Sequence, residues 1–127
     1  MSNRTPRLLV VDDELGLQKL AGRHAERAGF DVTIAATAAE AFDLAVTGSP
    51  DAILLDLLLP DGSGIDVLAR LKAEPKTADI PVVVWSGSDV VEGRSKAFDG
   101  GANDYFEKTE LKEIIDTLTR LLQAKSD

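Results

Sequence analysis

Residues 52–60 read AILLDLLLP, a short apolar run that ends in one acidic residue, Asp56, and continues into leucines and a proline. Four apolar residues in a row before a charge are typical of a strand buried on both faces, as the strands of a parallel sheet are. The chain contains other short runs rich in β-branched residues. The sequence predicts strands at 7–11, 31–35, 52–55, 81–85 and 102–106, of which the first, third and fourth lie inside the sheet.

Longer segments with helical periodicity separate these runs. The first segment places Leu17, Leu20, Ala21, Ala25 and Ala28 on one helical face. Gly29 is expected to end this helix, because a residue without Cβ suits the left-handed conformation that often follows a helix. Thr37 and Glu40 form a capping box that predicts the start of the second helix, and Ser63 is expected to cap the third.

The sequence predicts the last two helices with different clarity. The fourth, near residues 89–98, is the weakest, because Gly93 in a helix interior costs about 1 kcal/mol relative to alanine. The last is the clearest, with leucines and isoleucines recurring at three and four between Leu111 and Leu122. Strands that alternate with helices predict an α/β fold, a doubly wound five-stranded parallel sheet with helices on both faces.

Composition narrows the classes of function. The 127 residues suit one domain, and 44% apolar with 28% charged residues is close to the globular average. The net charge is −8 and the 14 basic residues form no run, which argues against binding to nucleic acid or to an anionic membrane. The absence of cysteine excludes disulfides and thiolate sites and fits a cytoplasmic location. The apolar run at 8–11 is too short for a signal peptide or a membrane span.

Polar side chains follow four of the predicted strands. They are Asp12, Asp13 and Glu14 after the first strand, Asp56 after the third, Ser86 after the fourth and Lys108 after the fifth. The carboxyl ends of parallel strands meet at one edge of a sheet, so we expect these side chains to lie together. Clustered carboxylates repel one another, and Mg²⁺ is the cation that prefers oxygen ligands. A lysine and a hydroxyl beside them suit a phosphoryl group, which a carboxylate can itself accept.

This set of residues, together with Tyr105, DLLLP at 56–60 and IPVV at 80–83, resembles the receiver domain of two-component response regulators. The resemblance extends from Leu8 to Leu122. It implies a flavodoxin-like fold with strand order 2-1-3-4-5, an order for which a receiver of this family is a standard example. It also implies that residues 1–127 form a single receiver domain without an output domain, similar to a chemotaxis regulator or a phosphorelay shuttle.

The resemblance assigns the acidic residues to phosphoryl chemistry. Asp56 corresponds to the phosphoacceptor. Asp13, Asp56 and the backbone carbonyl of Leu58 would ligate Mg²⁺, and Asp12 would act on the ion through water. Lys108 would pair with Asp56 and later with a phosphoryl oxygen.

The resemblance also implies a switch. Ser86 would bond another phosphoryl oxygen, and the Tyr105 ring would turn inward as Ser86 moves. The surface of the fourth helix, fifth strand and fifth helix would then report the state. The implied partners are a histidine kinase or a histidine phosphotransfer protein and a downstream protein target, with the chain a monomer or weak dimer and with no nucleic acid or membrane bound.

Three positions depart from the usual pattern or modify it. Thr109 follows Lys108 where the family usually has proline, commonly with a cis bond. A cis bond before a residue other than proline costs about 2.5–4 kcal/mol, so we expect a trans bond here, or a locally strained turn if the family geometry is kept, and the sequence leaves the exact reach of Lys108 open. Ser86 replaces the commoner threonine and keeps the hydroxyl. Leu58 is bulky and apolar where the side chain influences access of water, which predicts slower loss of the phosphoryl group by self-hydrolysis.

Each candidate residue also has a purely structural interpretation. Asp12, Asp13 and Glu14 can cap the first helix, Asp56 and Ser86 can be turn residues, and Tyr105 can be a half-buried packing residue. His24 flanks the apolar face of the first helix, so we expect a structural role there. Trp85 is expected in the core.

Two other functions remain open at this point. The first is a pseudo-receiver that binds partners without being phosphorylated, which the complete set of acids, hydroxyl and lysine disfavours. The second is a small Mg²⁺-dependent phosphatase with an aspartate nucleophile. Such enzymes typically carry Asp-x-Asp after the first strand, whereas Asp12 and Asp13 are adjacent. We therefore expect phosphoryl acceptance without turnover of a substrate.

Overall fold

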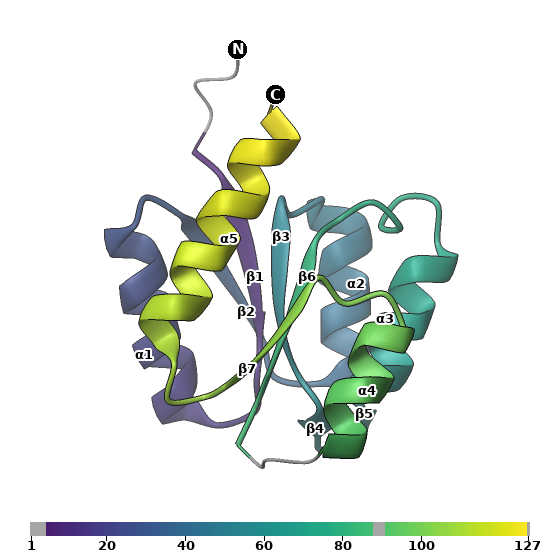
Figure 1. Ribbon diagram of the computed structural model, residues 1–127. Coiled ribbons are helices and arrows are strands. Elements are labelled where there is room, and N and C mark those ends of the chain that lie inside the picture. Colours follow the sequence, from purple (N-terminus) through teal and green to yellow (C-terminus); the bar gives the residue numbers. More distant parts are fainter. Residues whose placement is uncertain (1–4, 88–90, 127) are drawn as a thin grey trace.

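Five parallel strands form the central sheet of the computed structural model, in which residues 5–87 and 91–126 are described (Figure 1). The strands are β1 (Arg7–Val11), β2 (Asp31–Ala35), β3 (Ala52–Asp56), β6 (Val82–Ser86) and β7 (Asp104–Glu107). Their order, β2-β1-β3-β6-β7, confirms the predicted order 2-1-3-4-5 when only the strands of this sheet are counted. The remaining two strands, β4 (Leu58–Leu59) and β5 (Gly62–Ser63), form a separate antiparallel hairpin that the sequence analysis did not predict.

Helices cover both faces of the sheet (Figure 1). Within the described residues they are α1 (Leu15–Arg27), α2 (Ala38–Gly48), α3 (Gly64–Ala73), α4 (Val91–Asp99) and α5 (Leu111–Ser126). One apolar core lies between the sheet and α1 with α5, and a second lies between the sheet and α2, α3 and α4. Among the described residues, no helix is both long and apolar enough to span a bilayer.

Burial follows the position of each strand in the sheet. All residues of β3 and β6 are buried, as are the last four of β1, which confirms these three as interior strands. The edge strand β2 has three exposed residues out of five. The interior strands β1, β3 and β6 are shielded from water on both faces of the sheet, which is why their sequences are almost continuous apolar runs.

The predicted caps are confirmed. Gly29 has φ +101°, a conformation that L side chains rarely adopt, and it follows the C-cap of α1. The Thr37 hydroxyl accepts the Glu40 N–H at 3.1 Å, and the Glu40 carboxylate accepts the Ala36 N–H at 2.9 Å. The Ser63 hydroxyl accepts the N–H of Ile65 at 3.1 Å and starts α3.

Several predicted boundaries and one helical face were wrong. The strand predicted at 81–85 begins at Val82, because proline has no N–H for the ladder, although its carbonyl accepts the Ile53 N–H. The strand predicted at 102–106 spans 104–107, because the Ala102 N–H bonds the Ala97 carbonyl at the end of α4. Leu20 is 44% exposed and Ala28 is exposed, so the buried face of α1 is narrower than predicted. The predicted start of the fourth helix at residue 89 lies outside the described residues.

Candidate functional site

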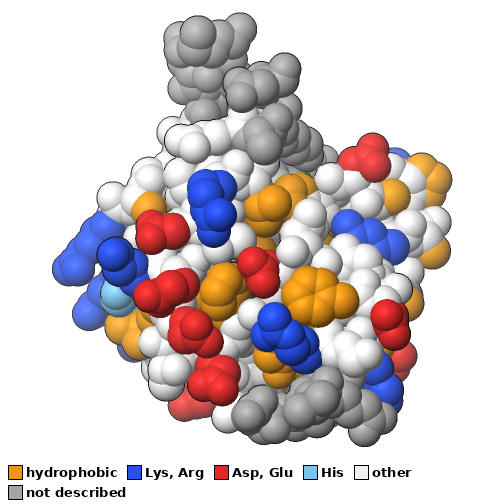
Figure 2. All heavy atoms as spheres, viewed as in Figure 1, with side chains coloured by type: hydrophobic (Ala, Val, Ile, Leu, Met, Phe, Trp, Pro, Cys, Tyr) orange, Lys and Arg blue, Asp and Glu red, His pale blue; other side chains and the backbone are white. Residues whose placement is uncertain are grey.

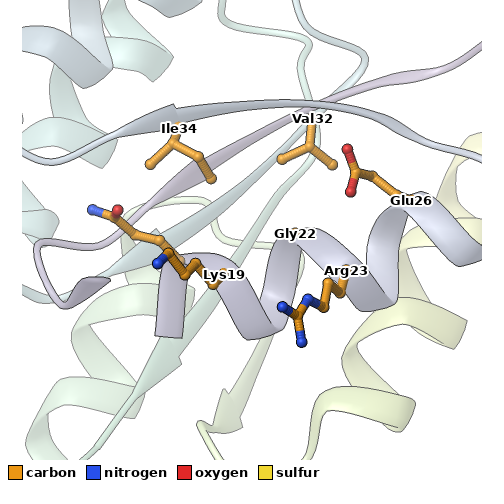
Figure 3. A pocket seen from close by; sticks show the side chains of 7 residues that line it. Lys19, Gly22, Arg23, Glu26, Val32 and Ile34 are labelled. Carbon is orange, nitrogen blue, oxygen red and sulfur yellow. The ribbon is translucent and has the colours of Figure 1, made fainter. Parts of the chain in front are cut away.

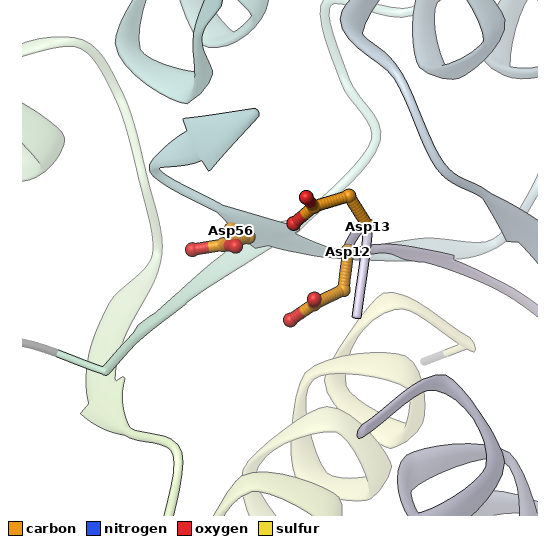
Figure 4. Close-up of side chains that lie close together, drawn as sticks. All are labelled: Asp12, Asp13 and Asp56. Carbon is orange, nitrogen blue, oxygen red and sulfur yellow. The ribbon is translucent and has the colours of Figure 1, made fainter. Parts of the chain in front are cut away.

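The carboxyl ends of the interior strands place acidic side chains at one edge of the sheet, as predicted. Carboxylate oxygens of Asp12, Asp13 and Asp56 all lie within 4.8 Å of one another. Figure 4 shows the three side chains converging from the end of β1 and the end of β3. Asp12 is fully buried and Asp56 is 3% exposed, whereas Asp13 is exposed to solvent. We call these three residues the acidic cluster.

Lys108 joins two members of the acidic cluster from the end of β7. Its Nζ lies 2.6 Å from Asp12 Oδ2 and 3.0 Å from Asp56 Oδ2. Its backbone N–H donates to the Ser86 carbonyl at 3.1 Å, which ties the residue after β7 to the end of β6. The reach of Lys108, which the sequence left open, extends to both buried aspartates. Thr109 follows it without any cis peptide bond among the described residues, and the ammonium still contacts Asp56.

Each buried aspartate uses its two oxygens differently. Asp12 Oδ1 accepts the Glu14 N–H at 2.8 Å, and Asp56 Oδ1 accepts the Leu58 N–H at 3.3 Å. The Oδ2 atom of each residue faces Lys108. The capping interpretation of the first acidic run therefore holds for one oxygen of Asp12, while Glu14, the N-cap residue of α1, makes no side-chain capping bond. One oxygen of each aspartate holds the backbone turn, and the other is directed at the cation.

Burial and charge shift two pKa values in this site. Burial raises the pKa of Asp56, and the Lys108 ammonium opposes this rise while the Asp12 carboxylate adds to it. Burial alone would lower the pKa of Lys108, but its hydrogen bonds and charge interactions with Asp12 and Asp56 outweigh burial and raise it. Lys108 is therefore protonated at neutral pH, and ionised Asp56 is held at a cost in free energy that a further cation would reduce.

The acidic cluster has the chemistry of a divalent cation site. Three carboxylates contribute oxygens, two of them are buried, and a single lysine ammonium faces them within the described residues. Oxygen ligands near one another with excess negative charge are what Mg²⁺ requires, and Mg²⁺ commonly binds through one or two carboxylates. The residues present therefore fit the ion.

Gly64 is a site residue that the sequence analysis missed. A Cβ at this position would overlap the Asp56 carbonyl oxygen and lie 2.8 Å from Leu57 Cα. The Gly64 N–H donates to the Leu57 carbonyl at 2.8 Å, so the start of α3 packs directly on the chain that carries Asp56. The sequence signal was a glycine directly after the predicted cap Ser63, but only the contact with Asp56 explains it.

The structure places the remaining candidates on the strands and the loop around this site. Ser86 is buried at the end of β6, next to Trp85, which is in register with Asp56. Tyr105 is 6% exposed and belongs to the core on the α2–α4 face, with the Arg94 guanidinium 5.7 Å from its ring centre. Leu58 is 71% exposed, and only its N–H is seen to contact Asp56. The predicted roles of these three residues stay predictions.

Two further features lie apart from the acidic cluster. His24 is half-buried on α1, where its Nδ1 lies 2.9 Å from the Leu20 carbonyl oxygen, in agreement with a structural role. A groove of about 420 Å³ lies between α1 and the edge strand β2 (Figure 3). It is lined by Gln18, Lys19, Gly22, Arg23, Glu26, Val32 and Ile34, and by no member of the acidic cluster.

Comparison with known proteins points to one family. A family model described as the response regulator receiver domain matches residues 8–119. The DNA-binding dual master transcriptional regulator RpaA of Synechocystis is 36% identical over 119 residues, which are 93% of this chain and 49% of that protein. The chain spans about half the length of the curated relatives it matches.

Solved structures share the whole architecture. The receiver domain of the Francisella response regulator 1452 has 28% sequence identity and a TM-score of 0.86, covering 94% of this chain and 98% of that one. A CheY-like receiver domain protein from Methanospirillum hungatei has a TM-score of 0.89 and covers 97% of this chain and 98% of that one. At 22% identity, this second likeness shows the fold alone.

Proposed function

Because the chain belongs to the response regulator receiver family, which signals through phosphorylation of an aspartate, we propose that Asp56 is the phosphoacceptor. One observation carries this assignment: Asp56 is the buried carboxylate at the end of an interior strand whose Oδ2 lies 3.0 Å from the Lys108 ammonium. The opposite Oδ1 accepts a backbone N–H, which fixes the carboxyl group in one orientation. Asp12 is more deeply buried, and Asp13 has no contact with Lys108 within the ion-pair distance.

The proposed reaction moves one phosphoryl group. A carboxylate oxygen of Asp56 attacks the phosphorus of a phosphohistidine or a small acyl phosphate, the bond from phosphorus to the donor breaks, and the donor leaves with the bonding electron pair. Lys108 would move its ammonium from Oδ2 of Asp56 to a phosphoryl oxygen. Ser86 would donate its hydroxyl to a second phosphoryl oxygen. The protein contributes position and charge, and it turns over no substrate.

The acidic cluster would hold Mg²⁺ for this reaction. Asp13, Asp56 and the Leu58 backbone carbonyl would be ligands, with Asp12 acting through water. When bound, the ion supplies positive charge that stabilises the phosphoryl oxygens. Asp13 is suited to admit the ion, because it is the one exposed member of the cluster.

We expect Mg²⁺ to stabilise the protein against heat. A ligand that binds only the folded state adds RT ln(1 + [L]/Kd), about 1.4 kcal/mol when free Mg²⁺ is about ten times Kd. Asp13→Ala should abolish this gain, because it removes the exposed ligand. Thermal melts with and without millimolar Mg²⁺ measure the effect. Glu14→Ala is the matched control, since it removes the adjacent acid, which makes no side-chain capping bond, and should respond as the wild type does. Equal melting temperatures with and without Mg²⁺ in the wild type would contradict the metal site.

The proposed partners follow from the direction of transfer. Receiver domains pair with histidine kinases, and we infer that a histidine kinase or histidine phosphotransfer protein supplies the phosphoryl group. The signal would leave through a protein target at the α4–β7–α5 surface, after Ser86 and Tyr105 rearrange, or by onward transfer of the phosphoryl group. The face that carries α5 shows a band of acidic side chains in Figure 2. This charge and the net charge of −8 support the absence of a nucleic-acid site in this chain.

Phosphorylation from a small donor tests the function directly. The protein is incubated with acetyl phosphate with and without Mg²⁺, and its intact mass is measured. We expect one phosphoryl adduct that requires Mg²⁺. Reduction with borohydride converts a phosphorylated aspartate to homoserine, which peptide mass mapping then locates. Homoserine at position 56 supports the assignment, and homoserine at position 12 or 13 overturns it.

The same experiment distinguishes the two alternatives. A folded protein that takes up no phosphoryl group would favour a pseudo-receiver that binds its partner without phosphorylation. Continuous release of phosphate from a generic phosphate ester, without a stable adduct, would favour a phosphatase. The comparisons favour neither alternative.

A further inference from the structure

Trp85 combines complete burial with an unsatisfied polar atom. Its side chain is 0% exposed in the core beneath α1 and α5, and its Nε1 has no hydrogen-bond partner among the described residues. A buried donor without a partner is unfavourable, and tryptophan indoles in cores usually find one. Phenylalanine would supply an aromatic ring here without that cost. The N–H group therefore does not account for a tryptophan at this position.

The alternation of side chains in the sheet places Trp85 on the same face as the acidic cluster's buried members. Trp85 is in register with Asp56 on β3 and with Phe106 on β7. Residues in register on neighbouring strands share a face, and so do residues two apart on one strand. Lys108, two residues after Phe106, extends over this face, and its Nζ lies 5.4 Å from the centre of the Trp85 ring.

Three groups thus surround the Lys108 ammonium. Two are the Oδ2 atoms of Asp12 and Asp56, at 2.6 and 3.0 Å, and the third is the ring of Trp85. The side chain is 15% exposed, so water screens these interactions only partly. An ammonium within about 6 Å of an indole centre is attracted by the negative charge on the ring face, most strongly when it is desolvated.

We propose that Trp85 is a positioning residue that holds the Lys108 ammonium between Asp12 and Asp56. A lysine has four flexible methylene groups, and the backbone bond from Lys108 to Ser86 restrains only their base. The ring restrains the other end from the core side, so that the ammonium stays beside Asp56. The consequence for phosphoryl transfer rests on the proposed function, whereas the contact itself does not.

The contact is tested by NMR on the metal-free, unphosphorylated protein. The ring current of an indole moves nearby protons upfield, so the ε-methylene protons of Lys108 should resonate upfield of those of exposed lysines. The resonance is assigned by its loss in Lys108→Met. Trp85→Phe should keep part of the shift, and Trp85→Met, which fills space without a ring, should remove it. A wild-type Lys108 resonance at the position of exposed lysines overturns the proposal without any variant having to fold.

A double-mutant cycle separates positioning from packing. In thermal melts of metal-free protein, Trp85→Met and Lys108→Met should be coupled by about three- to tenfold in the unfolding equilibrium constant, the range expected for an ammonium over an indole. Purely additive effects overturn the proposal, because a packing role of Trp85 would cost the same with or without the ammonium.

The rate of phosphorylation by acetyl phosphate gives the functional consequence. Trp85→Met should slow it by about three- to tenfold, because Lys108 is less often in place, and Trp85→Phe should lie between Trp85→Met and the wild type. Equal rates in Trp85→Met and the wild type would overturn the positioning role. If the wild type takes up no phosphoryl group, the proposed function fails, and the NMR shift and the cycle then decide the contact between Trp85 and Lys108 separately.

Discussion

Asp56→Asn is expected to abolish the phosphoryl adduct and to raise the melting temperature of the metal-free protein at neutral pH. The adduct is lost because an amide is not a nucleophile toward phosphorus. The gain in stability follows from the raised pKa of Asp56, whose first cause is burial. A raised pKa means that the folded state favours the neutral carboxyl group, so ionisation at neutral pH costs folding free energy, and the neutral amide removes that cost.

The stability gained by Asp56→Asn should depend on pH, because the pKa of Asp56 is raised in the folded state. A carboxyl group with a raised folded pKa contributes stability that is fully present below its unfolded pKa and is lost as the pH rises through the folded pKa. The advantage of Asp56→Asn should therefore be present at pH 7, where the buried carboxyl group must ionise, and should shrink as the pH falls and disappear near pH 4.

Thermal melts across this pH range, and intact mass after acetyl phosphate treatment, measure the two effects of Asp56→Asn. Asp116→Asn is the matched control, because it removes an equal charge from an exposed position on α5 and should keep the adduct. A phosphoryl adduct that persists in Asp56→Asn would show that another residue is the acceptor. A lower melting temperature at neutral pH would mean that the ion pair with Lys108 outweighs the burial of Asp56.

Gly64→Ala is expected to have the largest effect on stability. A Cβ at position 64 would overlap the Asp56 carbonyl oxygen and approach Leu57 Cα to 2.8 Å, and both neighbours are backbone atoms that cannot rotate away. The end of β3 and the start of α3 must then separate. Overpacking of this kind typically costs up to about 3 kcal/mol, which lowers the melting temperature by about 10 °C in a domain of this size. Because Asp56 moves with its backbone, phosphorylation should slow as well.

Gly16→Ala provides the control for this substitution. Gly16 is exposed on α1, and a Cβ there would meet nothing within 4 Å. Alanine is favoured over glycine in a helix by about 0.5–1 kcal/mol, so this variant should be as stable as the wild type or more so. Thermal and urea unfolding of both variants measure the difference. A Gly64→Ala protein with wild-type stability and phosphorylation would show that α3 can shift without moving Asp56.

Local patterns were enough to predict the architecture. The apolar run that ends at Asp56 and the similar runs in β1 and β6 identified the interior strands, because burial on both faces permits few polar residues. Capping residues such as Thr37 and Ser63 marked helix starts, since their hydrogen bonds span only two or three residues. The boundaries of β6 and β7 were wrong by one or two residues, because hydrogen bonds from α4 and from neighbouring strands decide where a ladder ends.

The residues at the strand ends were also predictable, because parallel strands bring their carboxyl ends to one edge. The sequence by itself thus determined the fold class and the meeting of Asp12, Asp13, Asp56 and Lys108. Only the tertiary structure decided which oxygen of each aspartate faces Lys108, why residue 64 must be glycine, and that the Trp85 ring lies beside the ammonium. Asp56 and Lys108 are 52 residues apart in the chain: their positions at strand ends predict a shared edge of the sheet, but which of their atoms touch depends on the packing of whole elements, which no local pattern encodes.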